Sequence, residues 1–102
     1  MTFCEVIESL CKHPQMYTMS GTFEEVVAWI EGYTMNARNN RQDARFQLYD
    51  FNRWLASKRN YPDHIVATSY LRQSYPEDKE ALAALASLFR EFVSSTDHNH
   101  VG

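Results

Sequence analysis

Histidines and cysteines are the residues with the clearest chemical potential, and their spacing decides which chemistry is open to them. His98-Asn99-His100 spells a nuclease motif, but such a site needs a ββα-metal scaffold and further ligands upstream. The motif stands here in a polar stretch without hydrophobic periodicity. Neither His13 nor His64 has a carboxylate or cysteine at a metal-ligand offset such as that of HExxH. We therefore predict no metal site and no cofactor.

Cys4 and Cys11 are seven residues apart in a segment of helical periodicity. This spacing puts them on one helix face, roughly 10 Å apart along the axis. A disulfide needs Cα atoms within about 7 Å, so the two cannot pair with each other. Because the stripe they share is apolar, it disfavours the thiolate that a cysteine nucleophile requires. We expect two reduced, mostly buried thiols.

The composition is that of one ordinary domain. The chain has 102 residues, 44% of them hydrophobic and 23% charged, and a chain of this length buries about two-thirds of its unfolded surface. It can therefore build a core without disulfides or metals. The scattered Gly21, Gly32 and Gly102 cannot form a phosphate-binding loop. With no nucleophile, metal or phosphate site expected, we predict that the protein is not an enzyme.

The hydropathy of the chain also indicates the cellular location that we expect. No run of about 18 apolar residues is present, so no membrane span is predicted. The first ten residues are acidic and amphipathic, unlike a secretion signal, which is basic and then apolar. We therefore expect a cytoplasmic protein.

Two capping boxes mark the starts of the first two helices. In each box a Thr precedes a Glu by three residues: Thr2 with Glu5, and Thr22 with Glu25. Apolar residues then recur at helical spacing. The first helix is expected to span about ten residues. The second is expected to run to about Ala37.

Three further helices are predicted in the rest of the chain. One covers about residues 43–58 and a short one covers 64–72, where Ile65, Val66 and Thr68 could equally make a short strand. The last begins after a capping signature at 74–77, has the clearest amphipathic pattern and is expected to end near Ser94. Residues 95–102 are polar and are expected to form a flexible tail.

The fold class that follows is all-α. Residues 1–94 are predicted to form a compact single-domain array of four to five amphipathic helices. Gly32 is expected to let a neighbouring helix approach closely. The residues expected in the core share helical stripes and are Phe3, Ile7, Val27, Ile30, Phe51, Leu55, Leu85 and Phe89.

Charge is unevenly distributed, although the net charge is only −3. Residues 1–33 carry a net charge of −4, residues 34–60 carry +4 and the remainder carries −3. The basic middle is interleaved with Phe46, Tyr49 and Trp54, a composition typical of nucleic-acid-binding faces. We favour the other interpretation, in which the aromatic residues belong to the core and the arginines pair with acidic helices around them.

Several motifs together resemble a family of small bacterial proteins. They are His13-Pro14-Gln15-Met16-Tyr17, Gly21-Thr22-Phe23, Trp29-Ile30-Glu31-Gly32-Tyr33, Phe51-Asn52-Arg53-Trp54-Leu55 and an acidic helix from Glu80 to Phe92. In the same order the family has an Arg-Pro-x-Met-Tyr start, an aliphatic-x-Gly-Tyr helix end, a Phe-x-x-Trp-Leu helix and a closing helix rich in Phe and Leu. The chain departs from this pattern at His13, where Arg is usual. The proteins it resembles are immunity proteins encoded beside polymorphic or contact-dependent growth inhibition toxins.

The resemblance implies a protein that binds a cognate toxin domain and neutralises it by occluding its active site or an exosite. Toxins that cleave nucleic acids hold phosphates in basic clefts, so an inhibitor can present carboxylates in their place. Glu24, Glu25 and Glu31 lie off the apolar stripe of the second helix, and Tyr17 offers an aromatic anchor. These four residues are the predicted partner-binding residues. As part of the same resemblance, Met16 and Tyr17 are expected to turn toward the core.

Two other functions stay open. One is a small helical nucleic-acid-binding regulator that uses the Arg-rich segment 38–59, in particular Arg41, Arg45 and Arg53. The other is a subunit that only scaffolds a larger complex. We expect the protein to be a monomer or a weak dimer. The acidic balance of the whole chain disfavours nucleic acid as the partner.

Overall fold

Five α-helices and one short 3-10 helix form the described part of the chain. The computed structural model describes residues 2–35, 42–62 and 65–101. For residues 42–46 and 96–101 it describes the backbone alone. The elements are α1 (Phe3–Lys12), η1 (Pro14–Met16), α2 (Phe23–Met35), α3 (Gln42–Arg59), α4 (Ala67–Ser74) and α5 (Asp78–Val101). These residues contain no strand, and the predicted all-α class is confirmed. None of the helices described is long and apolar enough to cross a membrane.

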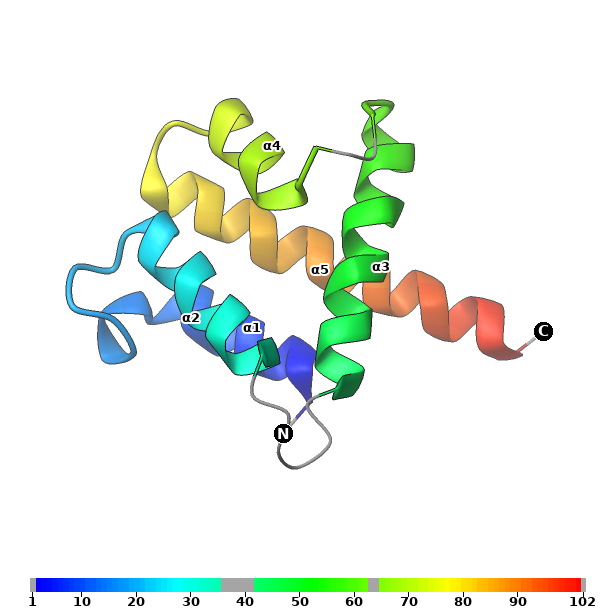
Figure 1. Ribbon diagram of the computed structural model, residues 1–102, viewed down its shortest axis with the longest axis horizontal. Coiled ribbons are helices and arrows are strands. Elements are labelled where there is room, and N and C mark those ends of the chain that lie inside the picture. Colours follow the sequence, from blue (N-terminus) through cyan, green and yellow to red (C-terminus); the bar gives the residue numbers. More distant parts are fainter. Residues whose placement is uncertain (1, 36–41, 63–64, 102) are drawn as a thin grey trace.

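The long helix α5 is the axis around which the others pack. In Figure 1 it runs from yellow to red, with α1 and α2 against its first half, α4 on its other side and α3 crossing it. The most extensive helix–helix contact is that of α1 with α5. Beyond the crossing with α3, the end of α5 projects away from the other helices (Figure 1).

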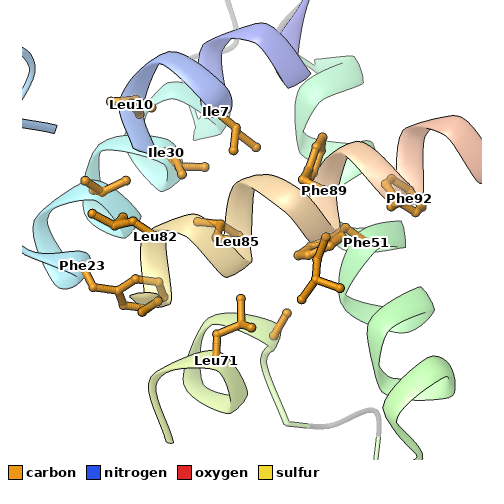
Figure 2. Packing of buried hydrophobic residues seen from close by; sticks show 14 of the residues in the cluster. Ile7, Leu10, Phe23, Ile30, Phe51, Leu71, Leu82, Leu85, Phe89 and Phe92 are labelled. Atoms are coloured by element: carbon orange, nitrogen blue, oxygen red, sulfur yellow. The ribbon is translucent and has the colours of Figure 1, made fainter. Parts of the chain in front are cut away.

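The core lies where the other four helices meet α5 (Figure 2). Its largest fully buried side chains are Phe51, Phe89, Ile7, Leu10, Leu55, Leu71, Leu85 and Val26. The rings of Phe51 and Phe89 lie 5.0 Å apart between centroids, which joins α3 to α5. Seven of the eight predicted core residues are buried, and the exception is Val27, which is half-buried.

The helix ends show why the sequence folds into these elements. Thr2 Oγ1 accepts a hydrogen bond of 3.1 Å from the Glu5 amide, and Glu5 Oε1 accepts one of 2.9 Å from the Thr2 amide. This confirms the first capping box. At the end of α3, Asn60 has a φ of 59° and the Tyr61 amide donates to the Ala56 carbonyl at 3.0 Å. That is the left-handed cap of a Schellman motif, and it stops α3 at Arg59.

The start of α4 differs from the prediction. The helix begins at Ala67 and extends to Ser74, whereas residues 64–72 were expected to be helical. Asn52 on α3 accepts a hydrogen bond of 3.2 Å from the Ala67 amide, so a side chain distant in sequence caps the helix. Val66 stays extended in front of it, and its side chain is 50% exposed.

The boundaries of α5 also differ from the prediction. Ser74 ends α4 and lies outside α5, so the predicted capping signature at 74–77 is wrong in placing a Ser cap there. At the other end, the helix continues past Ser94 to Val101. The chain has no Gly or Pro between Glu77 and Val101, so no residue breaks the helix where the hydrophobic period stops. The division of the chain at residue 94 remains a prediction.

Gly32 does not have the role expected of it. It is exposed, and a Cβ placed on it would meet no atom within 4 Å among the described residues. None of the described helices therefore makes use of its missing side chain. The predicted end of the second helix near Ala37 lies outside the described residues, which stop at Met35 on this side.

Candidate functional site

An exposed ridge runs along α2 and carries two of the predicted partner-binding residues. Glu24, Ala28, Glu31 and Met35 follow one another at intervals of four, three and four residues, and all four are exposed. This spacing places them on one helix face. The ridge therefore presents two carboxylates, two turns apart, on the side of α2 that faces α4.

Glu24 is held by a network that joins three helices. Its Oε2 lies 2.7 Å from Nε of Arg72 on α4. The Nη2 of Arg72 lies 2.8 Å from Oδ1 of Asp78 on α5, and the same oxygen accepts a hydrogen bond of 3.2 Å from the Phe23 amide at the start of α2. The guanidinium also lies over the Phe23 ring, 5.6 Å from its centroid. Glu24 is thus exposed, and its charge is already paired.

Glu25 has a structural task. Its amide donates to Thr22 Oγ1 at 3.2 Å, as a capping box requires, but its carboxylate accepts a hydrogen bond of 2.8 Å from the Ser20 amide. The second capping box is therefore half formed, and the Glu25 side chain fastens the preceding loop to α2. The side chain is half-buried and is less accessible to a partner than either ridge carboxylate.

Tyr17 lies on a different flank of α2. Its ring is 41% exposed and meets the edge of Trp29 at 5.7 Å between centroids. Trp29 is two residues from Glu31, and residues two apart on a helix do not share a face. The four predicted residues are therefore divided: Glu24 and Glu31 lie on the ridge, and Tyr17 and Glu25 lie at the loop. The expectation that Met16 and Tyr17 turn toward the core is wrong, because they are 77% and 41% exposed.

Two adjoining cavities lie between α2 and α4, with Glu31 at both. The first has a volume of about 390 Å³ and lies near Arg72, and the second has a volume of about 430 Å³ and reaches Asn52 and Leu48 on α3. Val27, Glu31, Thr68 and Ser69 line both cavities. We call the pair the α2–α4 groove. No described residue pairs with the Glu31 carboxylate, which makes it the free acidic group of this groove.

Only part of the basic segment 38–59 belongs to the described residues. Arg38 and Arg41 and the side chain of Arg45 lie outside the described residues. Lys58 pairs with Glu91 at 2.6 Å and lies 5.5 Å from the centroid of Trp54. Lys58 and the partly buried Trp54 agree with the favoured interpretation. Tyr49 does not, because it is 61% exposed, so the expectation that it belongs to the core is wrong. The side chain of Phe46 lies outside the described residues.

The two cysteines are free and half-buried. Burial, with a 3.5 Å hydrogen bond from Cys4 Sγ to Glu8 Oε1, raises the pKa of Cys4 to about 11. Burial raises the pKa of Cys11 to about 12. Both thiols are therefore protonated at neutral pH. Within the described residues, no three His, Cys, Asp or Glu side chains gather as they would around a metal ion. The side chains of His98 and His100 are outside that part of the chain.

Compared with protein-family models, with curated proteins and with solved structures, the chain has no significant match in any of the three. The resemblance to immunity proteins therefore rests on the quoted motifs alone. Sequence reasoning missed Arg72, Asp78 and the groove, because their proximity depends on how α2, α4 and α5 pack together. The available signal was the amphipathic pattern of α2, which left Glu24 and Glu31 on one outward face.

Proposed function

We propose that the chain is a protein-binding module that neutralises a cognate bacterial toxin domain by covering its active site or an exosite. The observation that carries the proposal is the acidic ridge of α2, in which Glu31 is exposed and unpaired by any described residue. Glu24 stands two turns away on the same face. The motif resemblance supports the same class of protein.

The ridge suits capture of a basic cleft. Charged groups at the rim of an interface mainly steer encounter and set specificity, and they do so without chemical catalysis. The unpaired Glu31 carboxylate can occupy a phosphate position in a nuclease cleft. Glu24 keeps a fixed orientation because Arg72 holds it. Glu31 has no such tie among described residues and is available to a partner's Lys or Arg.

Co-expression tests the proposal. Bacterial cells would express the chain together with a candidate toxin domain from a neighbouring open reading frame, and growth would be measured with the unaltered chain, with Glu31→Lys and with Glu80→Lys. Glu80 is the matched control because it is an exposed glutamate on α5 that does not line the groove. We expect the unaltered chain and Glu80→Lys to protect, and Glu31→Lys to associate more slowly with the toxin at low salt.

Equal protection and equal association rates for all three chains would remove the acidic ridge as the interface. Retention of the protein on heparin or DNA, with a steep loss of retention as salt rises, would instead favour the nucleic-acid-binding regulator. Arg53→Glu then becomes the informative variant, since Arg53 is a described residue of the basic segment. No protection by the unaltered chain against any neighbouring toxin domain would overturn the proposed function.

A further inference from the structure

We propose that the α2–α4 groove binds an amphipathic helix of a partner protein, with Lys or Arg beside its apolar face. The shape and charge of the groove favour such a helix whether or not the partner is a toxin, so this proposal can fail while the proposed function holds.

The shape of the groove fits a rod. Its two cavities share four lining residues and together follow α2 from Phe23 to Met35. Twelve steps of 1.5 Å give a length of about 18 Å, which matches about three turns of a docked helix. A helix satisfies its own backbone hydrogen bonds, and the described residues offer no strand edge to which an extended peptide could add.

Apolar residues form the floor of the groove and part of its rim. The buried residues Ile7, Ile30 and Leu85 form the floor of the second cavity. Met35 and Val66 stand at its edge, 65% and 50% exposed. They are two of the six large hydrophobic residues that are exposed in the described part of the chain, and both line the second cavity. Both side chains can bury apolar surface against the apolar face of a docked helix.

The charge of the groove favours a partner helix with basic residues beside its apolar face. Three lining residues are charged: Glu24, Glu31 and Arg72. Arg72 is already shared between Glu24 and Asp78, so it offers no net positive charge to a ligand. Glu31 lies where the two cavities join and is not paired with any described residue. A helix with a basic flank is therefore attracted, and one with an acidic flank is repelled.

The partial exposure of Val27 also favours a partner in the groove. It is the one predicted core residue that is not buried, and it lines both cavities. A valine in the middle of an amphipathic stripe is ordinarily covered by the fold. Among the described residues, the part of the Val27 side chain that remains exposed borders the two cavities.

A matched pair of synthetic peptides provides the test. Each would be a fluorescein-labelled 14-residue helix with leucines at intervals of three and four, flanked by lysines in one peptide and by glutamates in the other. Fluorescence anisotropy with the full chain at low salt would give both affinities. We expect the lysine peptide to bind at least about tenfold more tightly, because like charge faces Glu31 in the other peptide. Amide NMR shifts should change at Val27, Thr68 and Ser69.

Three variants locate the binding. Val66→Asn removes an apolar contact while supplying a good N-cap to α4, so the fold is kept, and it should weaken binding several-fold. Glu31→Gln should weaken it up to about fivefold and abolish the preference for lysine. Met19→Ser is the control, because Met19 is 94% exposed and lies outside the groove, and it should bind as the unaltered chain does.

Equal affinity for the two peptides, no binding of either, or unchanged binding by Val66→Asn would overturn the inference. A chain that protects cells but fails these peptide tests would lose the groove proposal and keep the proposed function. If the chain binds the lysine peptide at the groove without protecting cells, the groove proposal holds and the proposed function is lost.

Discussion

Arg72 on α4 holds Glu24 on α2 at 2.7 Å between Nε and Oε2, while Glu31, two turns further along the same ridge, is left without a partner among the described residues. Two glutamates that are equivalent in the helical pattern therefore have different tasks. Glu24 helps to fasten α2 to α4 and, through Arg72 and Asp78, to α5. Glu31 contributes charge to the groove.

Neutralising the two glutamates should separate these tasks. Glu24→Gln breaks the ion pair with Arg72 and should lower the free energy of unfolding by about 0.2–1 kcal/mol, the range for exposed pairs. Glu31→Gln should change it by less than about 0.5 kcal/mol, as a surface substitution does. Urea unfolding measures both values. Equal losses in the two variants would mean that the Arg72 pair contributes nothing to stability.

Acid should weaken the contact between α1 and α5. Arg90 Nε and Nη2 donate to Glu8 Oε1 and Oε2 at 2.9 and 2.7 Å, and this pairing lowers the pKa of the Glu8 carboxyl. Because the folded-state pKa is lowered, the stabilisation is present above the unfolded pKa and is lost as the pH falls through the folded pKa. The unfolded pKa of a glutamate is about 4.3.

Glu8→Gln is the variant that isolates this effect. Above about pH 5 it should be less stable than the unaltered chain, and the difference should shrink as the pH falls below about 4. Arg90→Gln should remove the same pH-dependent difference, since either change breaks the pair. The Glu5 carboxyl, whose pKa is lowered by hydrogen bonds from Thr2, is unchanged in both variants. Parallel stability curves over the whole acid range would contradict the role of the pair.

Local signals predicted the fold well. The first capping box and the stripe that buries Phe3, Ile7 and Leu10 define α1 as it is seen. The start of α4 could not be predicted, because its cap comes from Asn52, fifteen residues earlier and on another helix. The groove could not be predicted either, since hydrophobic spacing identifies Val27 as core without showing whether a neighbour covers it.

The two described glycines should respond oppositely to alanine. Gly21 has a φ of +72°, and a Cβ there would come within 2.8 Å of Gln15 Cγ, so Gly21→Ala should destabilise the protein by at least about 1 kcal/mol. Gly32 is in the interior of α2, and a Cβ there would meet no described atom within 4 Å, so Gly32→Ala should stabilise by about 0.5–1 kcal/mol. Thermal melts of the two variants measure the contrast. A lower melting temperature for Gly32→Ala would show that the glycine has a role outside helix propensity.

The cysteines should react slowly with alkylating agents. The pKa values of about 11 for Cys4 and about 12 for Cys11 leave only a minute fraction of thiolate at pH 7.5. Iodoacetamide labelling of the folded protein, followed by mass spectrometry, should be far slower than labelling in urea. Cys11 should be the slower of the two, because its burial raises the pKa further. Rapid labelling of Cys11 in the folded chain would show that its site opens readily.

Val26 and Val27 offer a direct comparison between the core and the groove. They are adjacent residues of α2 with the same side chain, but Val26 is fully buried and Val27 is half-buried against the α2–α4 groove. Val26→Ala leaves a cavity surrounded by protein and should cost on the order of 2 kcal/mol. Val27→Ala removes methyl groups that already border open space, so the loss should be about half as large. Urea unfolding measures both losses.

Binding of the lysine-flanked peptide, measured where both variants are folded, should show the reverse order. Val27→Ala should weaken the binding, and Val26→Ala should leave it unchanged. If Val27→Ala costs as much stability as Val26→Ala and has no effect on the peptide, Val27 belongs to the closed core and the groove is not a binding surface.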